Sequence, residues 1–306
     1  MENRRLTGAF TAIVTPFKQD GSVDESVLQT LVERQIEAGI NGIVPCGTTG
    51  EAAAMTLEEH RFVVETVVKQ TAGRVPVIAG AGANNTNKAI ELSKICQDAG
   101  ADALLQIAPG YIKPTQRGII EHFQAILEAV DLPIVVYNVP GRTSITITPE
   151  TILKLAENPR IIAVKQALTD LDQLSQIIAG RPTNFAVLSG EDAYTLPMIA
   201  LGGDGVVSVV GNELPKQMVQ LCESALSGNR ELVVERHQKL APLMAANFVE
   251  SNPIPVKFAM SKMGLLENVL RTPMTPLAAE FEKTVSDALQ ASQNKENLQS
   301  AETVVA

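Results

Sequence analysis

The residues of this sequence that could do chemistry are a lysine, two tyrosines, two threonines and an arginine, placed where apolar runs end. Lys165 interrupts the strand-like run IIAVKQ at 161–166, although lysine is rarely buried without a partner because removing an ammonium from water is costly. If the strand face of Ile161, Ala163 and Lys165 points into a core, desolvation lowers the lysine pKa and leaves amine that can attack a carbonyl. A strand-end lysine that reaches solvent is the alternative. Position alone leaves both open.

A tyrosine near such an amine could carry protons. Tyr137 stands at another predicted strand end, and Tyr111 follows a third. The hydroxyls of Thr48 and Thr49 could connect the two phenols in a donor–acceptor chain. Tyrosine is also an ordinary β-sheet residue, and GTTG would serve any turn, so each of these signals is weak by itself.

Arg142 follows Gly141 beyond a predicted strand, and its planar guanidinium suits a substrate carboxylate as well as a surface salt bridge. The histidines His60, His122 and His237 lie on predicted helices without metal-ligand spacing, so we expect no metal site. The chain has neither a GxGxxG in strand–helix context nor a GxxxxGK[ST], and we therefore expect no nucleotide cofactor.

Composition indicates a globular protein with a large core and an ordinary charged surface. The 306 residues are 45% hydrophobic and carry a net charge of −9, which argues against a nucleic-acid surface. The sequence contains no uninterrupted apolar stretch of about 18 residues, so we expect no membrane span. The N-terminal residues lack the long apolar core of a signal peptide. Three widely spaced cysteines fit a reducing cytoplasm and no disulfide framework.

Apolar strand-like runs alternate with amphipathic helical patterns along most of the chain. We predict strands at 9–15, 41–46, 75–80, 102–108, 133–138, 161–166, 185–189 and 205–210. Helices are predicted at 24–38, 57–71, 87–99, 118–129, 149–157, 170–179, 192–200 and 214–227. Eight strand-then-helix units predict a (β/α)₈ TIM barrel, whose reactive groups lie at the carboxyl ends of the strands. A doubly wound open sheet competes, but it usually has fewer strands and an early phosphate-binding turn.

Beyond the barrel, further helices are predicted at 229–246, 256–264 and 277–291 without intervening strands. The predicted organisation is therefore a barrel at 1–228 with the active site, a C-terminal helical extension at 229–292 and a mobile polar tail at 293–306. Thr56 with Glu59 fits a capping box, and Thr275-Pro276 fits a cap residue before a proline at the first helical position.

With these residues collected, the sequence resembles the 4-hydroxy-tetrahydrodipicolinate synthase (dihydrodipicolinate synthase) group of the pyruvate-dependent class I aldolases. The likeness runs from about residue 7 to 290. It is carried by motifs in order and at barrel spacing: AIVTPF at 12–17, GTTGE at 47–51, PVIAGAGAN at 76–84, YNVPGRT at 137–143, VLSGED at 187–192, GGDGVVSV at 202–209 and NPIPVK at 252–257. YNVPGRT is the most informative, because related lyases for sugar acids usually lack an arginine there.

The resemblance implies a reaction and a role for each site residue. Lys165 would form a Schiff base with pyruvate, and Tyr137 would relay protons, joined through Thr49 to a Tyr111 that reaches across from a neighbouring subunit. Arg142 would hold the carboxylate of L-aspartate 4-semialdehyde. The pyruvate and imine would be lined by a further set, namely Thr48, Thr49, Gly190 and Val207. The enzyme would be a homotetramer, a dimer of dimers, that uses no cofactor.

The chain also departs from the family pattern. Gln166 stands where the family usually has a glutamate after the lysine, and Thr169 stands where it has a glycine. A pyruvate-type aldolase or lyase for a sugar acid therefore stays as an alternative, and a non-catalytic keto-acid-binding barrel as a more distant one. Many members are inhibited by lysine in a cleft that here would be lined by Ala52, Leu57, His60, Asn84, Lys88 and Gly110. A positive Lys88 and the missing aromatic at Gly110 predict that lysine does not inhibit this chain.

Overall fold

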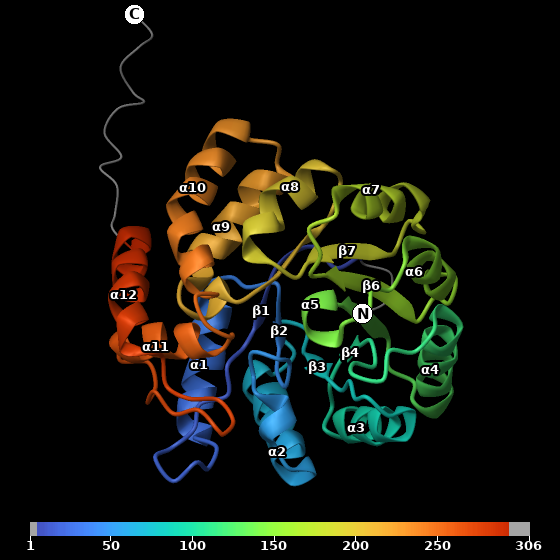
Figure 1. Cartoon of the computed structure of the whole chain (residues 1–306), viewed down its shortest axis with the longest axis horizontal. Helices are drawn as coiled ribbons and strands as arrows, with labels where there is room; N and C mark the ends of the chain where they lie inside the picture. The colour runs from blue at the N-terminus through green and yellow to red at the C-terminus, as the bar shows by residue number, and fades with distance from the viewer. Residues whose placement is uncertain (1–4, 294–306) are drawn as a thin grey trace, which may run out of the picture.

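The computed structural model describes residues 5–293, and within them eight parallel strands form a barrel surrounded by helices (Figure 1). The hydrogen-bonded order is β2-β1-β8-β7-β6-β5-β4-β3. A parallel bridge between Ile43 and Val77 joins the two end strands and closes the barrel. The predicted TIM barrel is confirmed. Its strands are β1 (Gly8–Ala12), β2 (Gly42–Val44), β3 (Ile78–Gly80), β4 (Ala103–Ile107), β5 (Ile134–Asn138), β6 (Ile161–Gln166), β7 (Ala186–Ser189) and β8 (Gly205–Ser208).

The helices follow the strands in alternation and lie outside them. They are α1 (Glu25–Glu37), α2 (Leu57–Thr71), α3 (Thr86–Asp98), α4 (Gln116–Ala129), α5 (Pro140–Thr143), α6 (Pro149–Ala156), α7 (Leu171–Gly180), α8 (Thr195–Ala200) and α9 (Pro215–Leu226). Short 3₁₀ turns lie at Ala52–Ala54, Asp192–Tyr194 and Val210–Asn212. The capping box at the start of α2 is present, with Thr56 and Glu59 bonding each other's backbone N–H groups.

Alternating side chains on the strands build two separate apolar cores. One fills the barrel interior and includes Phe10, Val44, Leu105, Val135 and Val207. The other packs the outward strand faces against the helices, as Val136 and Val164 do. The closed sheet by itself therefore shields a side chain on the interior face from water, without a contribution from the helices.

The register of β5 and β6 brings Tyr137 opposite Lys165. The pairing shifts near its start, so that Ile134 pairs with Ile161 but Val135 pairs with Ala163. Because of this irregularity Ile161 belongs to the outer core, whereas Ala163 lies in the interior core. The sequence-based prediction that Ile161 shares the face of Lys165 is therefore wrong, although Ala163 does share it.

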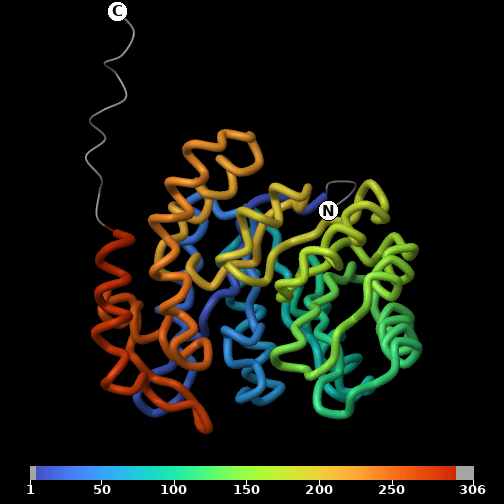
Figure 2. The backbone as a smooth tube through the Cα atoms, turned by 45° about the horizontal axis from the view of Figure 1, so that its top comes forward, coloured from blue at the N-terminus to red at the C-terminus, as the bar shows by residue number. Residues whose placement is uncertain are grey.

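The helices α10 (Arg230–Ala246), α11 (Ile254–Lys262) and α12 (Ala279–Gln293) follow the barrel as the predicted helical extension. In Figures 1 and 2 these orange-to-red helices lie beside the blue helix α1. The predicted start of the last helix at Thr275-Pro276 is wrong, since α12 begins at Ala279. The division at residue 228 into separate domains stays a prediction, and the predicted tail lies outside the described residues except for Gln293. No helix within 5–293 is long and apolar enough to cross a membrane.

A buried ion pair and a backbone hydrogen bond attach the extension to the turn after β2. Lys257 in α11 is fully buried, forms an ion pair with Glu51 and donates to the carbonyl of Val269 at 2.9 Å. The backbone N–H of Arg271 donates to the other oxygen of Glu51 at 3.0 Å. The extension therefore holds the GTTGE segment in place at the carboxyl end of the barrel.

Candidate active site

Lys165 lies inside the barrel near the carboxyl end of β6, with 5% of its surface exposed. Its Nζ is 4.3 Å from the centre of the Tyr137 ring on the neighbouring strand. Burial lowers the pKa of Lys165 to about 8, and the nearby charges of Glu191 and Asp192 offset part of that decrease. An appreciable share of the amine is therefore neutral near physiological pH, which is the state that attacks a carbonyl.

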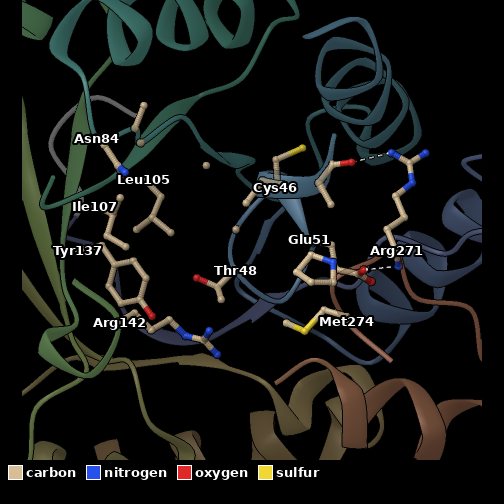
Figure 3. Close-up of a pocket in the computed structure, with 18 of the residues that line it drawn as sticks. Cys46, Thr48, Glu51, Asn84, Leu105, Ile107, Tyr137, Arg142, Arg271 and Met274 are labelled. Atoms are coloured by element: carbon tan, nitrogen blue, oxygen red, sulfur yellow. Dashed lines mark hydrogen bonds between the residues drawn. The ribbon is translucent and has the colours of Figure 1, made fainter. Parts of the chain in front are cut away.

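Tyr137 is buried beside this amine and reaches toward the turn after β2. Burial raises the pKa of its phenol, and a hydrogen bond with Thr48 partly counteracts the increase. Figure 3 shows the Thr48 hydroxyl on the side of the pocket that faces Tyr137. The phenol thus stays protonated at neutral pH and can exchange a proton with a second hydroxyl.

Thr49 does not occupy the position beside Tyr137 that the sequence-based hypothesis gave it. Its buried Oγ1 accepts a hydrogen bond of 2.9 Å from Asn252 Nδ2 in the C-terminal extension. The neighbouring Thr48 takes the place next to the phenol. Adjacent residues of the turn point to different sides, so the hydroxyl that contacts Tyr137 belongs to Thr48.

Arg142 lies on α5, a helix of a single turn directly after β5 that the sequence-based prediction treated as a loop. Pro140 opens this turn at its first position, where a missing N–H has no cost. The Arg142 side chain lines the same pocket as Tyr137 and donates from Nη2 to the carbonyl of Asn252 at 3.0 Å. Its other donors leave capacity for a carboxylate.

Gly190 and Val207 belong to the next two strand segments around the barrel from Lys165. Gly190 follows β7, and a Cβ at this position would come within 2.8 Å of the Ala167 side chain and 3.0 Å of its backbone nitrogen. Only glycine therefore permits this close approach of the segments after β6 and β7. Val207 on β8 is buried in the interior core. Neither residue lines the pocket around Tyr137 and Arg142.

Two acidic residues near Lys165 were missed as functional candidates by the sequence analysis. Glu191 is half-buried and Asp192 is fully buried, and burial raises the pKa of both carboxyl groups. Asp192 accepts backbone hydrogen bonds from Val209 at 2.9 Å and Val210 at 3.0 Å. The signal available in the sequence was the SGED segment at a strand end, but strand-end acids are common.

Tyr111 lies away from Lys165 and Tyr137 within this chain. Its side chain is 88% exposed, and its backbone φ of 67° is in the left-handed region that non-glycine residues rarely adopt. Ile112 beside it is 61% exposed. The chain by itself therefore does not bring Tyr111 into the site.

The family departures at 166 and 169 do not touch the reactive groups. Gln166 is buried next to Lys165 in sequence but points to the opposite face of β6, as strand alternation requires. Thr169 is exposed in the segment that follows the strand.

Tyr137, Arg142 and Thr48 line a pocket of about 460 Å³ at the carboxyl end of the barrel, and Lys165 is not among its lining residues. In Figure 3 Tyr137 and Arg142 form one wall, and Glu51, Met274 and Arg271 lie across from them. The wall between includes Thr48, Asn84, Leu105 and Ile107. Within residues 5–293 no group of His, Cys, Asp or Glu side chains is arranged to hold a metal ion.

A (β/α)₈ barrel whose interior presents a desolvated lysine under a buried tyrosine defines a lyase of the class I aldolase type. The particular family follows from comparison with known proteins. Residues 5–292 match the model of the Dihydrodipicolinate synthetase family, and the chain belongs to that family.

Individual relatives agree along nearly the whole chain. The 4-hydroxy-tetrahydrodipicolinate synthase of Maridesulfovibrio salexigens is 50% identical over 286 residues, which cover 93% of this chain and 98% of the relative. A chloride-inhibited dihydrodipicolinate synthase from Acinetobacter baumannii, solved with pyruvate, is 43% identical with a TM-score of 0.92 and covers 94% of this chain and 99% of its own. The synthase of Cyanidioschyzon merolae, solved with lysine bound, is 40% identical with a TM-score of 0.92 and covers 95% and 99%.

Proposed function

We propose that the chain is a 4-hydroxy-tetrahydrodipicolinate synthase, which condenses pyruvate with L-aspartate 4-semialdehyde in the biosynthesis of diaminopimelate and lysine. The observation that carries the proposal is the Lys165 amine, buried 4.3 Å from the centre of the Tyr137 ring inside the barrel. The relatives with this name extend over almost all of the chain.

The proposed reaction begins with attack of the neutral Lys165 amine on the keto carbon of pyruvate. Loss of water gives an imine, and loss of a methyl proton converts the imine into an enamine. The enamine carbon attacks the aldehyde of the second substrate, and the amine of that substrate then closes the ring onto the imine carbon and releases Lys165. Tyr137 carries the protons that these steps release and require, together with Thr48.

The second substrate is an amino acid with an aldehyde, and the pocket offers groups for its charges. Arg142 at the pocket wall is suited to its carboxylate. Thr48, Thr49, Gly190 and Val207 surround the pyruvate part, as the family resemblance implies. The reaction requires no cofactor beyond the covalent imine on Lys165.

We further propose a cytoplasmic homotetramer built as a dimer of dimers. The exposed Tyr111 and Ile112 support contact with another subunit, because large apolar side chains exposed at neighbouring positions favour an interface. Three free, buried cysteines suit a reducing compartment.

The function is tested by borohydride reduction with pyruvate, followed by mass mapping of the modified lysine. The adduct is expected on Lys165 and absent in Lys165→Ala. Lys257 serves as an internal control, because burial lowers its pKa to about 8 as well but an ion pair occupies it. An adduct on Lys257, or on no lysine, would contradict the mechanism.

The acceptor is tested by offering aspartate semialdehyde and sugar-acid aldehydes in parallel. Arg142→Ala should weaken the use of aspartate semialdehyde while the pyruvate adduct still forms. Arg117→Ala is the matched control, since Arg117 is an exposed helix residue whose Nε lies 3.6 Å from Glu121 Oε1. Faster turnover of a sugar-acid aldehyde, with Arg142→Ala unchanged, would favour the alternative lyase.

A further inference from the structure

Asn252, in the segment that leads into α11, contacts both of the loops that form the site. It is buried, with 5% of its surface exposed. Its side-chain Nδ2 donates to Thr49 Oγ1 at 2.9 Å, and its backbone oxygen accepts from Arg142 Nη2 at 3.0 Å. One residue of the C-terminal extension thus joins the turn after β2 to the turn after β5.

The two contacts differ in what a substitution removes. The bond to Thr49 comes from the side chain and is lost when the side chain is shortened, whereas the bond from Arg142 goes to the backbone and persists only if the segment stays in place. The buried ion pair between Lys257 and Glu51 joins the extension to the turn after β2 at a second point. The ion pair of Lys257 holds the extension against the barrel. Within that arrangement, the Thr49–Asn252 bond determines where the backbone carbonyl of Asn252 lies, and this carbonyl orients Arg142.

We propose that Asn252 is a positioning residue, which orients Arg142 for the carboxylate of the second substrate through its link to Thr49. This inference rests on the proposed function and adds to it a residue outside the barrel. Because Thr49 Oγ1 already accepts from the amide, its own proton stays available for donation toward the substrates.

The test is a double-mutant cycle of Asn252→Ala and Thr49→Val, with KM and kcat measured for each substrate. Each single variant should lower kcat/KM for aspartate semialdehyde about tenfold, mainly through KM, as expected when one buried hydrogen bond is lost. The double variant should fall by about tenfold as well, because both changes break the same bond. Thr49→Ser, which keeps the hydroxyl, should restore most of the loss, and borohydride trapping of pyruvate should persist in all variants.

Asn247→Ala is the matched control. Asn247 is a buried asparagine of the same extension whose Nδ2 donates to Glu213 Oε2 at 2.7 Å, in the segment after β8 and not in either of the two site loops. This variant should lower the melting temperature without raising KM. If Asn252→Ala does not fold, Asn252→Ser replaces it in the cycle, since its side chain is too short to reach Thr49.

Losses that multiply to about a hundredfold in the double variant, or an unchanged KM in Asn252→Ala, would overturn the positioning role. Both outcomes leave the proposed function standing as long as the unaltered enzyme forms the Lys165 adduct and turns over. Failure of that trapping in the unaltered enzyme would instead contradict the function itself.

Discussion

The chemistry of the site depends on one amine whose protonation is set by its surroundings. Desolvation favours the neutral form of Lys165, while Glu191 and Asp192 favour the charged form. These opposing influences leave the pKa of Lys165 at about 8. The residue is thereby reactive at neutral pH without being permanently uncharged.

The rate of pyruvate trapping should follow the titration of this amine. Below pH 8 the rate should rise about tenfold per pH unit, because the neutral fraction increases by that factor, and above pH 8 it should level off. Glu191→Gln removes a charge that raises the lysine pKa, so its profile should shift to lower pH. Single-turnover trapping from pH 6 to 10 measures both curves, and a shift to higher pH would contradict the assigned influence of Glu191.

Tyr137 should matter for turnover far more than for the fold. Tyr137→Phe keeps the ring beside Lys165 but removes the hydroxyl, so kcat should fall on the order of 10²-fold, as for a lost general acid–base. Thr48→Val should reduce kcat by less, and Thr49→Val should act mainly on KM. Steady-state kinetics separates these effects, and a larger kcat loss for Thr49→Val than for Thr48→Val would restore Thr49 to the proton path.

The sequence could not distinguish the two threonines. A strand has a period that tells which side chains share a face, but a turn has none, and Thr48 and Thr49 are both in a turn. The same limit hid the partnership of Thr49 with Asn252, because the two residues lie far apart in the chain. Lys165 and Tyr137 could be predicted, since each ends an apolar strand run whose neighbours were also predicted.

At the scale of elements, the alternation of apolar strand-like runs with amphipathic helical patterns predicted every strand of the barrel to within a few residues. The exceptions have local causes. The four residues of α5 are too few to show a helical period, and Ile161 changes face at a register shift that no pattern announces. Thr275-Pro276 has the chemistry of a helix start, yet α12 begins only at Ala279.

The attachment of the C-terminal extension to the barrel should contribute a large part of the free energy of unfolding. Lys257→Met leaves the carboxylate of Glu51 buried without its ammonium partner, which typically costs about 3–5 kcal/mol. The double change Lys257→Met with Glu51→Gln should recover much of that loss, because no unpaired charge remains. Urea unfolding measures both variants, and a single variant as stable as the unaltered chain would show that the ion pair contributes little.

At the scale of the whole molecule, Tyr111 belongs to a surface and not to the site of its own chain. If it completes a neighbour's site, sedimentation should show at least a dimer, and Tyr111→Ala should lower turnover while Lys165 trapping persists. Lys113→Ala in the same loop is a suitable control for loop disturbance. A fully active monomer would refute the shared tyrosine.

Lysine in the millimolar range should leave the activity essentially unchanged. Lys88 on α3 is exposed, and its Nζ lies 3.7 Å from Glu91 Oε2. In the cleft that the family resemblance implies, Lys88 would place a positive group where an effector's ammonium needs a negative one. Gly110 provides no aromatic cover. Initial rates with and without lysine measure the effect, Lys88→Glu is the variant expected to gain sensitivity, and saturable inhibition of the unaltered enzyme would contradict this prediction.

The way in which the barrel closes determines which strand junction opens locally most easily. β5 and β6 pair along the whole length of β5, whereas β2 and β3 meet through the bridge of Ile43 with Val77 and the bond from Gly80 N to Pro45 O at 2.9 Å. Local opening favours the junction with fewer hydrogen bonds. Lys165 and Tyr137 therefore lie in the half of the barrel with the more continuous strand pairing. The turn that carries Thr48 lies beside the junction of β2 and β3, and its position depends on the ion pair of Glu51 with Lys257 in the extension.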